Sequence, residues 1–485
     1  MIKKIRKKYT NMPLPVKAGM WFMICSIIPQ VITVIMTTIF TRILSTSDYG
    51  ISSNYWAWYN ILSIFITLNL NAGVYNNAMM KYEKDRDAYT SATLGLSILL
   101  GMLGFAVLMI FRNPLSQIMS LPVSLLLCMA LQCLLYNSYG CWVSRVKYEY
   151  NYKHLIIITL IVSILSPLLS VVFIFFSENK AVGKVWGQNA IYILLGVIFY
   201  VLAFSKNKKI YNKEYWSFAL KFNLPLVPHY LSLIILNQSD RVMITSMCGA
   251  SENGLYSVAY SAASLLLILN SSLTMTLTPW CYDNMKNHKF GAMKKTINVI
   301  CCIYAGIDLM LIMLAPEAIS ILAGAKYAEA VYVIPPLASS MYLILLYNIY
   351  SIFEFYYEKT KPVMICSTLS AGLNILLNYL FIPKYGFIAA AYTTLACYLF
   401  NSVMHIFVLR VIESKLGGVG VSVGGSFGIG LFLVLASIVI TYLYPFPEFR
   451  WSIFIVVSVV VILKRDYFFA LIKMIRNRRK NDRID

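Results

Sequence analysis

Charged residues are scarce in this sequence, and acidic residues are the scarcest. Only 13% of the 485 residues are charged, and 20 Asp and Glu stand against 41 Lys and Arg. A soluble globular domain averages about 25% charged residues. Hydrophobic residues make up 59% of the chain, and the mean hydropathy is +0.70. This composition excludes an ordinary soluble protein and predicts an all-α integral membrane protein whose solvent is mostly lipid.

The sequence also lacks the motifs of several common activities. It contains no Walker A loop, no HExxH or GxSxG motif and no cluster of aspartates in a loop. These absences exclude direct use of ATP and leave no hydrolytic or transferase site, so we predict a protein that is not an enzyme. Helix-turn-helix, zinc-finger and RNP signals are missing too, and the net charge of +21 therefore predicts no nucleic-acid partner.

The ten cysteines form neither a metal site nor a disulfide pattern. None belongs to a CxxC pair, and almost all lie within or beside apolar runs. We expect them to be small core side chains, and we expect no resident metal or cofactor. No small-residue cleavage site follows the first apolar run, which we expect to be a retained helix.

Apolar runs of about 20 residues, the length that crosses a bilayer, recur along the whole chain. About fourteen segments fit, near 17–40, 51–72, 90–111, 121–142, 154–176, 184–204, 222–246, 255–279, 295–315, 329–352, 362–382, 386–409, 422–444 and 450–463.

Lys and Arg alternate strongly between successive loops. One set of loops carries basic clusters at the N-terminus and within 81–86, 145–153, 206–221, 286–295 and 464–483. The alternate set carries only Arg42, Arg112, Lys180, Lys184, Lys326, Lys384 and Arg450. Because cytoplasmic loops are rich in Lys and Arg, we predict a multi-pass protein of the plasma (inner) membrane with both termini in the cytoplasm. The positive charge would then face anionic membrane lipids.

The sequence predicts two related halves. Arg42 and Arg241 each stand near a helix end, before a short outer loop and a Gly-Ile or Gly-Leu pair that opens an aromatic- and serine-bearing helix. Six predicted helices separate the two motifs, so we expect a parallel repeat with a pseudo-twofold axis along the membrane normal. The predicted parts are a six-helix bundle over 1–204, a basic cytoplasmic connector over 205–221, a second six-helix bundle over 222–410, two additional helices over 411–463 and a basic cytoplasmic tail over 464–485.

Polar side chains share one face of four predicted helices, 17–40, 51–72, 222–246 and 255–279. A single Ser or Thr in a membrane helix usually bonds back to its own helix or ties it to a neighbour. Four stripes together favour a hydrated cavity whose hydroxyls and amides would bind the hydroxyls of a glycan. The cavity residues that we single out are Gln30, Thr37, Asn60, Asn71, Asn237, Ser264 and Ser271.

Two arginines suit an anionic ligand. Arg42 and Arg241 each stand at or near the outer end of a predicted helix. The guanidinium fork binds phosphate oxygens in a bidentate manner, so both are candidates for contacting a pyrophosphate. For Arg42 a snorkelling role at the membrane interface fits the sequence equally well.

Three further ionisable residues lie inside apolar runs, where each is costly and marks a candidate site. Asp240, Asp308 and His229 are candidates for coupling transport to a proton or sodium ion. The alternative for Asp308 is a protonated acid bonded to a neighbour such as Tyr304. The alternative for His229 is a satisfied core histidine.

Four short patches carry a family resemblance. They are Phe40-Thr-Arg-Ile-Leu-Ser-Thr-Ser-Asp-Tyr-Gly50, Leu224-Pro-Leu-Val-Pro-His229 with Ser239-Asp-Arg241, Asn253-Gly-Leu-Tyr-Ser-Val-Ala-Tyr260, and Asn374-Ile-Leu-Leu-Asn-Tyr-Leu-Phe-Ile-Pro-Lys-Tyr-Gly386. In these patches and in its overall topology the chain resembles the Wzx-type flippases for polysaccharide repeat units (O-antigen, capsule or teichoic acid). These belong to the multidrug/oligosaccharidyl-lipid/polysaccharide exporter (MOP) superfamily. Ala390 departs from the pattern, which has a glycine there.

The resemblance implies two six-helix bundles in a V shape with two extra helices. It implies alternating access that moves an undecaprenyl-pyrophosphate-linked oligosaccharide from the cytoplasmic to the outer leaflet, coupled to a proton or sodium gradient or to the membrane potential. The implied partners are this lipid-linked substrate, membrane lipids and the polysaccharide polymerase or assembly proteins.

Three alternatives stay open at this point. A drug/cation antiporter of the same superfamily would need a more acidic cavity. A peptidoglycan-precursor flippase would use the same chemistry on another glycan. A membrane polysaccharide polymerase or ligase would need a sizeable outer loop with clustered Arg and His, and the predicted outer loops are short.

Overall fold

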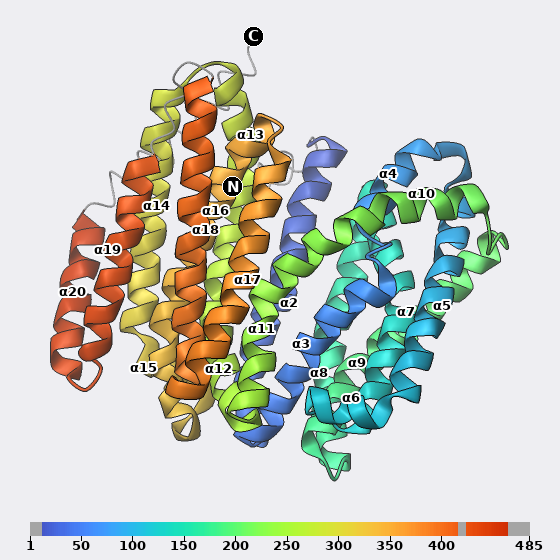
Figure 1. Cartoon of the computed structure of the whole chain (residues 1–485), viewed down its shortest axis with the longest axis horizontal. Helices are drawn as coiled ribbons and strands as arrows, with labels where there is room; N and C mark the ends of the chain where they lie inside the picture. Colours follow the sequence, from blue (N-terminus) through green and yellow to red (C-terminus); the bar gives the residue numbers. More distant parts are fainter. Residues whose placement is uncertain (1–11, 416–422, 464–485) are drawn as a thin grey trace, which may run out of the picture.

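The structure is a computed structural model that describes residues 12–415 and 423–463, and this part of the chain is almost entirely helical (Figure 1). The first half contains α2 (Leu14–Ile43), α3 (Thr46–Thr67), α4 (Gly73–Lys81), α5 (Arg86–Ile110), α6 (Arg112–Met119), α7 (Val123–Tyr148), α8 (Tyr152–Phe176), α9 (Lys180–Lys206) and α10 (Lys213–Asn223). The second half contains α11 (Val227–Met247), α12 (Ala250–Ala263), α13 (Leu265–Lys286), α14 (Phe290–Met313), α15 (Ala315–Ala323), α16 (Ile334–Tyr356), α17 (Thr360–Tyr385), α18 (Phe387–Lys415), α19 (Val423–Tyr442) and α20 (Pro447–Leu463). The predicted basic tail over 464–485 lies outside the described residues.

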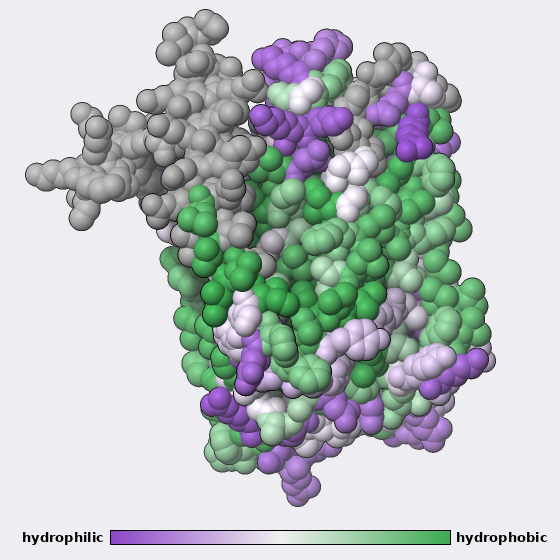
Figure 2. Space-filling view, turned by 90° about the vertical axis from the view of Figure 1, so that its left-hand side faces the viewer, coloured by the Kyte–Doolittle hydropathy of each residue, from purple (hydrophilic) through white to green (hydrophobic). Residues whose placement is uncertain are grey.

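The described helices are those of a multi-pass integral membrane protein. Eleven are long and apolar enough to cross a membrane, or twelve if the bent pair α12 and α13 counts as one span. A helix covers each of the fourteen predicted segments, but two do not meet this test: α3 is too polar, and the described α20 has only 17 residues. On the face shown in Figure 2, an apolar belt lies between two hydrophilic ends, as lipid on the sides and water at both ends require.

The helices pack in two groups. The N-terminal group consists of α5, α7, α8 and α9, and the C-terminal group includes α16, α17 and α18 (Figure 1). Between them, α3 packs against α11 and α12, and α2 packs mainly against α8. The largest apolar core lies in the C-terminal group, while several smaller cores hold the N-terminal group together.

Helix α3 has a well-defined start because its first turn is capped. Ser45 Oγ accepts the backbone N–H of Asp48 (3.0 Å), and the Asp48 carboxylate accepts the backbone N–H of Ser45 (3.3 Å). This capping box satisfies backbone donors that a helix otherwise leaves open at its N-terminus. It fixes where α3 begins, at Thr46, which is also where its contact with α12 begins.

Two glycines let α3 and α12 cross in backbone contact. A Cβ atom on Gly50 would lie 1.7 Å from the carbonyl oxygen of Ala250, and one on Gly254 would lie 2.1 Å from that of Thr46. The contact is reciprocal, since each glycine meets the residue four positions before the other glycine. Any side chain at either position would push the helices apart, so this crossing depends on both glycines.

Polar contacts surround this glycine crossing. The hydrogen bonds join Thr46 Oγ1 to Ser251 Oγ (2.7 Å), Ser53 Oγ to Ser257 Oγ (2.6 Å), and Asn253 Nδ2 to the Gly50 carbonyl (2.9 Å). Nearby, Lys326 and Thr41 bond the carbonyls of Leu44 and Leu322. Together these contacts close the molecule at the end that the loop charges predict to be outer.

The crossing yields a testable prediction. In Gly254→Ala, the new Cβ must displace the backbone of α3, and overpacking of this kind costs about 1–3 kcal/mol. We expect thermal unfolding of the purified protein at a lower temperature. We also expect less disulfide formation between Thr46→Cys and Ser251→Cys, measured in a chain whose accessible cysteines are replaced by serine.

Gly306→Ala is the matched control, because no atom of the described residues lies within 4 Å of its added Cβ. Alanine in a helix interior is favoured over glycine by about 0.5–1 kcal/mol, so this variant should unfold no earlier than the wild type. Equal stability and equal cross-linking in Gly254→Ala would show that the glycine contact is unimportant.

Candidate functional site

A cavity of about 410 Å³ lies between the N-terminal group and helices α11 and α12. Helices α2, α3, α8 and α9 form most of its wall, and α11 and α12 close the opposite side. Its wall is about half polar, with hydroxyls and amides from Thr33, Thr37, Ser52, Ser53, Asn60, Thr159, Ser163, Ser166, Gln188, Gln238, Ser257 and Ser261.

Lys184 brings a buried positive charge to this cavity from α9. Its side chain is only 7% exposed, and Nζ donates to Ser52 Oγ (2.7 Å). The ammonium also lies over two aromatic rings, 4.0 Å from the centroid of Tyr49 and 4.9 Å from that of Phe40. Rings and one hydroxyl stabilise the cation partly, but none of them carries a full negative charge.

Arg241 brings a second positive charge from α11, on the opposite side of the cavity. Arg241 is only 8% exposed, and its Nη1 donates to Gln238 Oε1 (2.9 Å) and to the carbonyl oxygen of Asn237 (3.1 Å). The guanidinium lies 4.2 Å from the ring centroid of Tyr260. Asp240 precedes it in sequence but makes no ion pair with it, since neighbouring helical residues point about 100° apart.

The cavity is therefore cationic and uncompensated. Lys184 and Arg241 are the charged residues of its described lining, and no carboxylate is among them. Neither cation is ion-paired with an acidic residue in the ranges 12–415 and 423–463. Buried charges are normally paired, so this arrangement favours an anionic ligand that supplies the missing counter-charge.

The structure does not bring Arg42 to this cavity. Arg42 is exposed at the end of α2 and is not part of the lining. It precedes Gly50 by eight residues, whereas Arg241 precedes Gly254 by 13. Since this is a difference of five residues at a rise of about 1.5 Å each, Arg241 lies about 7–8 Å farther along its helix from the glycine crossing than Arg42 does. The two arginines are thus not equivalent in position.

Lys184 is the residue that sequence reasoning missed. The loop charges count it with the outer loops, and the apolar runs place it at the start of the predicted span 184–204, whereas in the structure α9 begins at Lys180 and includes it. A usable signal was present, since Lys184, Gln188 and Tyr192 recur every four residues and therefore share one helix face. All three line the cavity.

The predicted glycan contacts divide into two sets. Thr37 and Asn60 line the cavity, whereas Gln30, Ser264 and Ser271 do not. Instead Gln30 bonds the carbonyl of Ser26 (3.0 Å), Ser264 that of Ser261 (2.7 Å), and Ser271 that of Leu267 (2.9 Å). Such bonds within one helix are the usual role of isolated polar residues in a membrane span.

The remaining two amides lie elsewhere. Asn71 lines a second pocket that adjoins the cavity. Asn237 faces the C-terminal group, where its Oδ1 accepts from the hydroxyl of Tyr398 (3.2 Å).

Asp240 lies at the centre of a buried hydrogen-bond network in the C-terminal group. Its Oδ2 accepts from the hydroxyls of Tyr256 (2.5 Å) and Thr394 (2.7 Å), and its Oδ1 accepts from Asn378 Nδ2 (2.7 Å). All three partners donate to the carboxylate. They come from α12, α17 and α18, so the group joins three helices to α11.

A second layer of bonds fixes the orientation of these partners. Asn378 Oδ1 accepts from the hydroxyl of Thr393, and Asn378 Nδ2 also donates to Asn374 Oδ1 (3.2 Å). Asn374 Oδ1 accepts in addition from Ser239 Oγ (2.6 Å). The Asn378 amide therefore cannot turn over without losing these bonds.

The other two coupling candidates are isolated. Asp308 is wholly buried on α14, and neither carboxyl oxygen has a partner among the described residues. The hydroxyl of Tyr304, its expected neighbour, donates to the carbonyl of Leu266 (3.0 Å) instead. His229 is half-buried near the start of α11, and its Nδ1 likewise finds no partner in the described chain.

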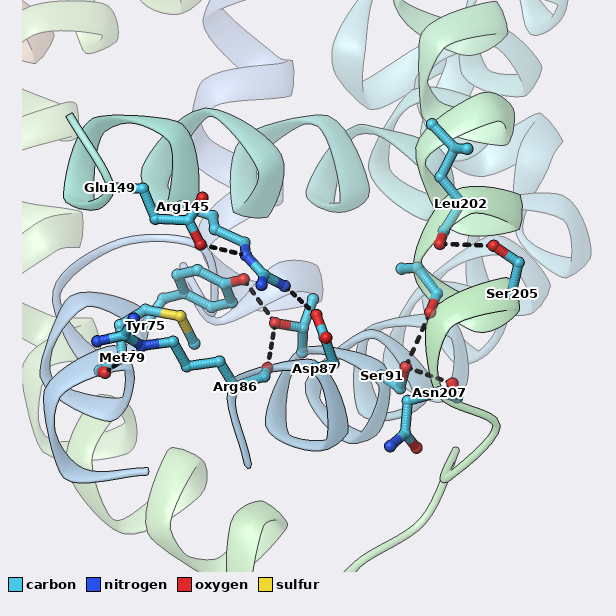
Figure 3. Close-up of polar contacts among 12 residues, drawn as sticks. Tyr75, Met79, Arg86, Asp87, Ser91, Arg145, Glu149, Leu202, Ser205 and Asn207 are labelled. Carbon is cyan, nitrogen blue, oxygen red and sulfur yellow. Dashed lines mark hydrogen bonds and ion pairs between the residues drawn. The ribbon is translucent and has the colours of Figure 1, made fainter. Parts of the chain in front are cut away.

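A further polar cluster ties the opposite end of the N-terminal group together (Figure 3). Arg145 of α7 lies between Glu149, to which it donates (2.8 Å), and Asp87 of α5, to which it also donates. Ser91 of α5 donates to the carbonyl oxygen of Asn207 beyond α9 (2.6 Å). Arg145 is paired with both carboxylates, so the cluster holds the helix ends together.

The Asp240 network leads to a prediction about stability. Asp240→Asn replaces one carboxylate oxygen, which accepts hydrogen bonds, by an NH₂ group, which donates them. In either orientation of the new amide, this NH₂ faces a donor: the Nδ2 of Asn378, or the hydroxyls of Tyr256 and Thr394. An unsatisfied buried polar group costs about 1–3 kcal/mol, so we expect a clearly lower temperature of thermal unfolding.

Asp308→Asn is the matched control, since no hydrogen bond is lost there. It should shift the unfolding temperature less than Asp240→Asn does. The reverse order would show that the Asp240 bonds do not stabilise the fold.

Two packed groups of membrane helices around a cationic cavity define a polytopic membrane protein with the fold of MOP-superfamily transporters. The fold matches that of the lipid II flippase MurJ in an inward closed conformation, with a TM-score of 0.71 at 16% identity over 92% of this chain and 99% of that one. It also matches a multidrug resistance MATE family transporter of the MOP superfamily, inward-facing, with a TM-score of 0.61 at 13% identity over 79% and 98%.

The sequence places the chain in a family. Residues 16–285 match the family model described as polysaccharide biosynthesis protein, and the chain belongs to this family. Two curated relatives come from Haemophilus influenzae. "Lsg locus putative protein 1" is 27% identical over 179 residues, and an uncharacterized membrane protein is 24% identical over 182 residues. Each match covers 35% of this chain and 43% of the relative.

Proposed function

We propose that this protein is a Wzx-type flippase. It moves undecaprenyl-pyrophosphate-linked oligosaccharide repeat units from the cytoplasmic to the outer leaflet for surface polysaccharide export. The observation that carries the proposal is the pair of uncompensated cations, Lys184 and Arg241, in one half-polar cavity. A pyrophosphate is a strong anion that both side chains bind through charge-assisted hydrogen bonds. A drug/cation antiporter would need carboxylates at this place instead.

The orientation of the chain follows from its loop charges, which put both termini in the cytoplasm. In this orientation the glycine crossing closes the outer end, so the cavity receives substrate from the cytoplasmic side. Export then requires α3 and α12 to separate at Gly50 and Gly254 while the opposite end closes. The reciprocal contact of the two glycines supports the parallel repeat of the two bundles, 1–204 and 222–410.

Ion coupling is best assigned to Asp240 among the three candidates. Its carboxylate accepts hydrogen bonds from Asn378 Nδ2 and from the hydroxyls of Thr394 and Tyr256, and so joins α11 to three other helices. A proton or sodium ion that binds this carboxylate competes with these donors and so alters the contacts between the helices, whereas the carboxyl oxygens of Asp308 and the Nδ1 of His229 have no partner in the described chain.

A peptidoglycan-precursor flippase is the second candidate, because the fold is shared with a lipid II flippase. Both candidates need a pyrophosphate site and differ in the glycan. The family of polysaccharide biosynthesis proteins favours the first.

The pyrophosphate site can be tested by binding. Lys184→Gln and Arg241→Gln each remove one charge while leaving a side chain that still donates. A hydrogen bond to a charged group contributes about 1.5–3 kcal/mol, so each variant should bind undecaprenyl pyrophosphate about 10- to 100-fold more weakly. The measurement is a titration of the purified full-length protein in lipid nanodiscs.

Arg42→Gln is the matched control, since Arg42 is exposed and lies outside the cavity. Its affinity should equal that of the wild type. If the two cavity variants bind as tightly as the wild type, or if Arg42→Gln is the damaging change, the assignment of the site is wrong.

Gene deletion tests the direction and the substrate. We expect one undecaprenyl-linked repeat unit to accumulate in the cytoplasmic leaflet and the corresponding surface polymer to disappear, as measured by mass spectrometry of lipid-linked oligosaccharides in each leaflet. Accumulation of lipid II would select the second candidate. Unchanged pools of lipid-linked oligosaccharides together with greater sensitivity to cationic drugs would contradict both flippase candidates and indicate a drug-efflux function.

A further inference from the structure

A second pocket, which we call the side pocket, adjoins the cationic cavity. It has a volume of about 250 Å³ and lies between α3, α7 and α9. Trp56, Asn60 and Tyr192 line both spaces and so form their common wall. Helix α3 runs from the cationic cavity to the side pocket. Ser52, which accepts the hydrogen bond of Lys184, and Asn60 are eight residues apart on this helix, which corresponds to about 12 Å at a rise of about 1.5 Å per residue.

Aromatic rings form much of the wall of the side pocket. They are Trp56, Tyr59, Tyr136 and Tyr192. Trp56 meets Tyr59 edge to face at 5.5 Å, and Tyr136 lies 5.8 Å from Tyr192. The Trp56 indole N–H also donates to Gln188 (3.1 Å). These contacts hold the rings in place, so their faces are preorganised for a ligand.

Amides provide the polar part of the same wall. Gln132 accepts from the hydroxyl of Tyr55 (2.8 Å), and Asn137 donates to a serine of α5, so both are engaged. The side-chain amides of Asn60 and Asn71 make no hydrogen bond to another residue of the described ranges, and only the backbone carbonyls of these residues accept, from Ser63 and Ser144.

Asn71 is nevertheless held in place. It packs against Gly140, where an added Cβ would lie 2.0 Å from its Nδ2. Two amides thus have free donors and acceptors beside fixed aromatic faces.

We propose that the side pocket is a sugar subsite, which binds the first sugar ring of the lipid-linked substrate while Lys184 and Arg241 bind the pyrophosphate. This inference rests on the proposed function. The C–H groups of a pyranose ring carry partial positive charge and pack on the negative faces of aromatic rings. Its hydroxyls and N-acetyl group match the free amides of Asn60 and Asn71.

The volume of the side pocket and its lack of charged lining residues limit which sugars it can bind. Pockets for drug-sized ligands measure about 300–1,000 Å³, so the side pocket suits a single ring. None of the side chains that line it, all of them described, is charged. A uronic acid would lose the hydration of its carboxylate there without gaining a cation, so the subsite selects an uncharged sugar.

The test compares two lipids on the full-length protein in nanodiscs: undecaprenyl pyrophosphate, and the same lipid carrying one N-acetylglucosamine. In the wild type the sugar should tighten binding about tenfold, which corresponds to about one good polar or stacking contact. In Tyr136→Ala and in Asn71→Ala the ratio of the two affinities should fall toward one. Tyr379→Ala removes a tyrosine that is 65% exposed on α17 and should keep the wild-type ratio.

Two further measurements sharpen the result. Tyr136→Phe keeps the aromatic ring and should keep the wild-type ratio of the two affinities. This variant distinguishes a loss of stacking from misfolding if Tyr136→Ala unfolds at a lower temperature. The lipid carrying one glucuronic acid should bind no more tightly than the sugar-free lipid.

The outcomes are distinct. Tight binding of undecaprenyl pyrophosphate with no gain from the sugar would overturn the subsite and leave the flippase proposal standing. A wild-type ratio in both Tyr136→Ala and Asn71→Ala would also overturn it. If neither lipid binds the wild type, the proposed function fails, and the subsite fails with it.

Discussion

The crossing of α3 and α12 at Gly50 and Gly254 is the contact on which the rest of the arrangement depends. It brings the two halves within backbone distance, which only glycine permits. From this point α3 continues along the molecule, and its successive turns carry Ser52 and Ser53, then Trp56 and Asn60. The first pair lines the cationic cavity, and the second lies between that cavity and the side pocket. The place of one helix crossing therefore sets the place of both the cationic cavity and the side pocket.

The buried charges of the molecule follow two different rules. Arg450 forms a bidentate pair with Glu317, and Glu354 contacts His405 at 2.7 Å with both side chains wholly buried. The attraction within such a pair offsets part of the free energy that is lost when its charges leave water. Among the described residues, the partners of the Lys184 ammonium are one hydroxyl and two aromatic rings. The contrast with Arg450 and Glu354, which have partners within the chain, argues that the counter-charge of Lys184 comes from outside the chain.

Sequence reasoning located the helices well because lipid imposes long apolar runs on any chain that crosses it. It was less able to place side chains around the cavity. Arg42 and Arg241 stand in similar motifs, but the second half has five more residues between its arginine and its glycine, and this offset alone separates their positions. Two of the three partners of Asp240 lie 138 and 154 residues further along the chain, on α17 and α18, where no local pattern could indicate them. Tertiary packing, rather than periodicity, assembles that network.

Helix α11 joins the two chemical sites of the molecule. Asp240 points into the C-terminal group, and Arg241, about 100° further around the helix, points into the cavity. A change at the carboxylate alters its bonds to α12, α17 and α18, and any resulting shift or rotation of α11 also moves Arg241. Helix α12 carries Tyr256 of the network and Gly254 of the crossing within one turn. An ion bound at Asp240 would therefore act on Arg241 of the cationic cavity and on the glycine crossing through two adjacent helices, which is the linkage that a coupled transporter requires.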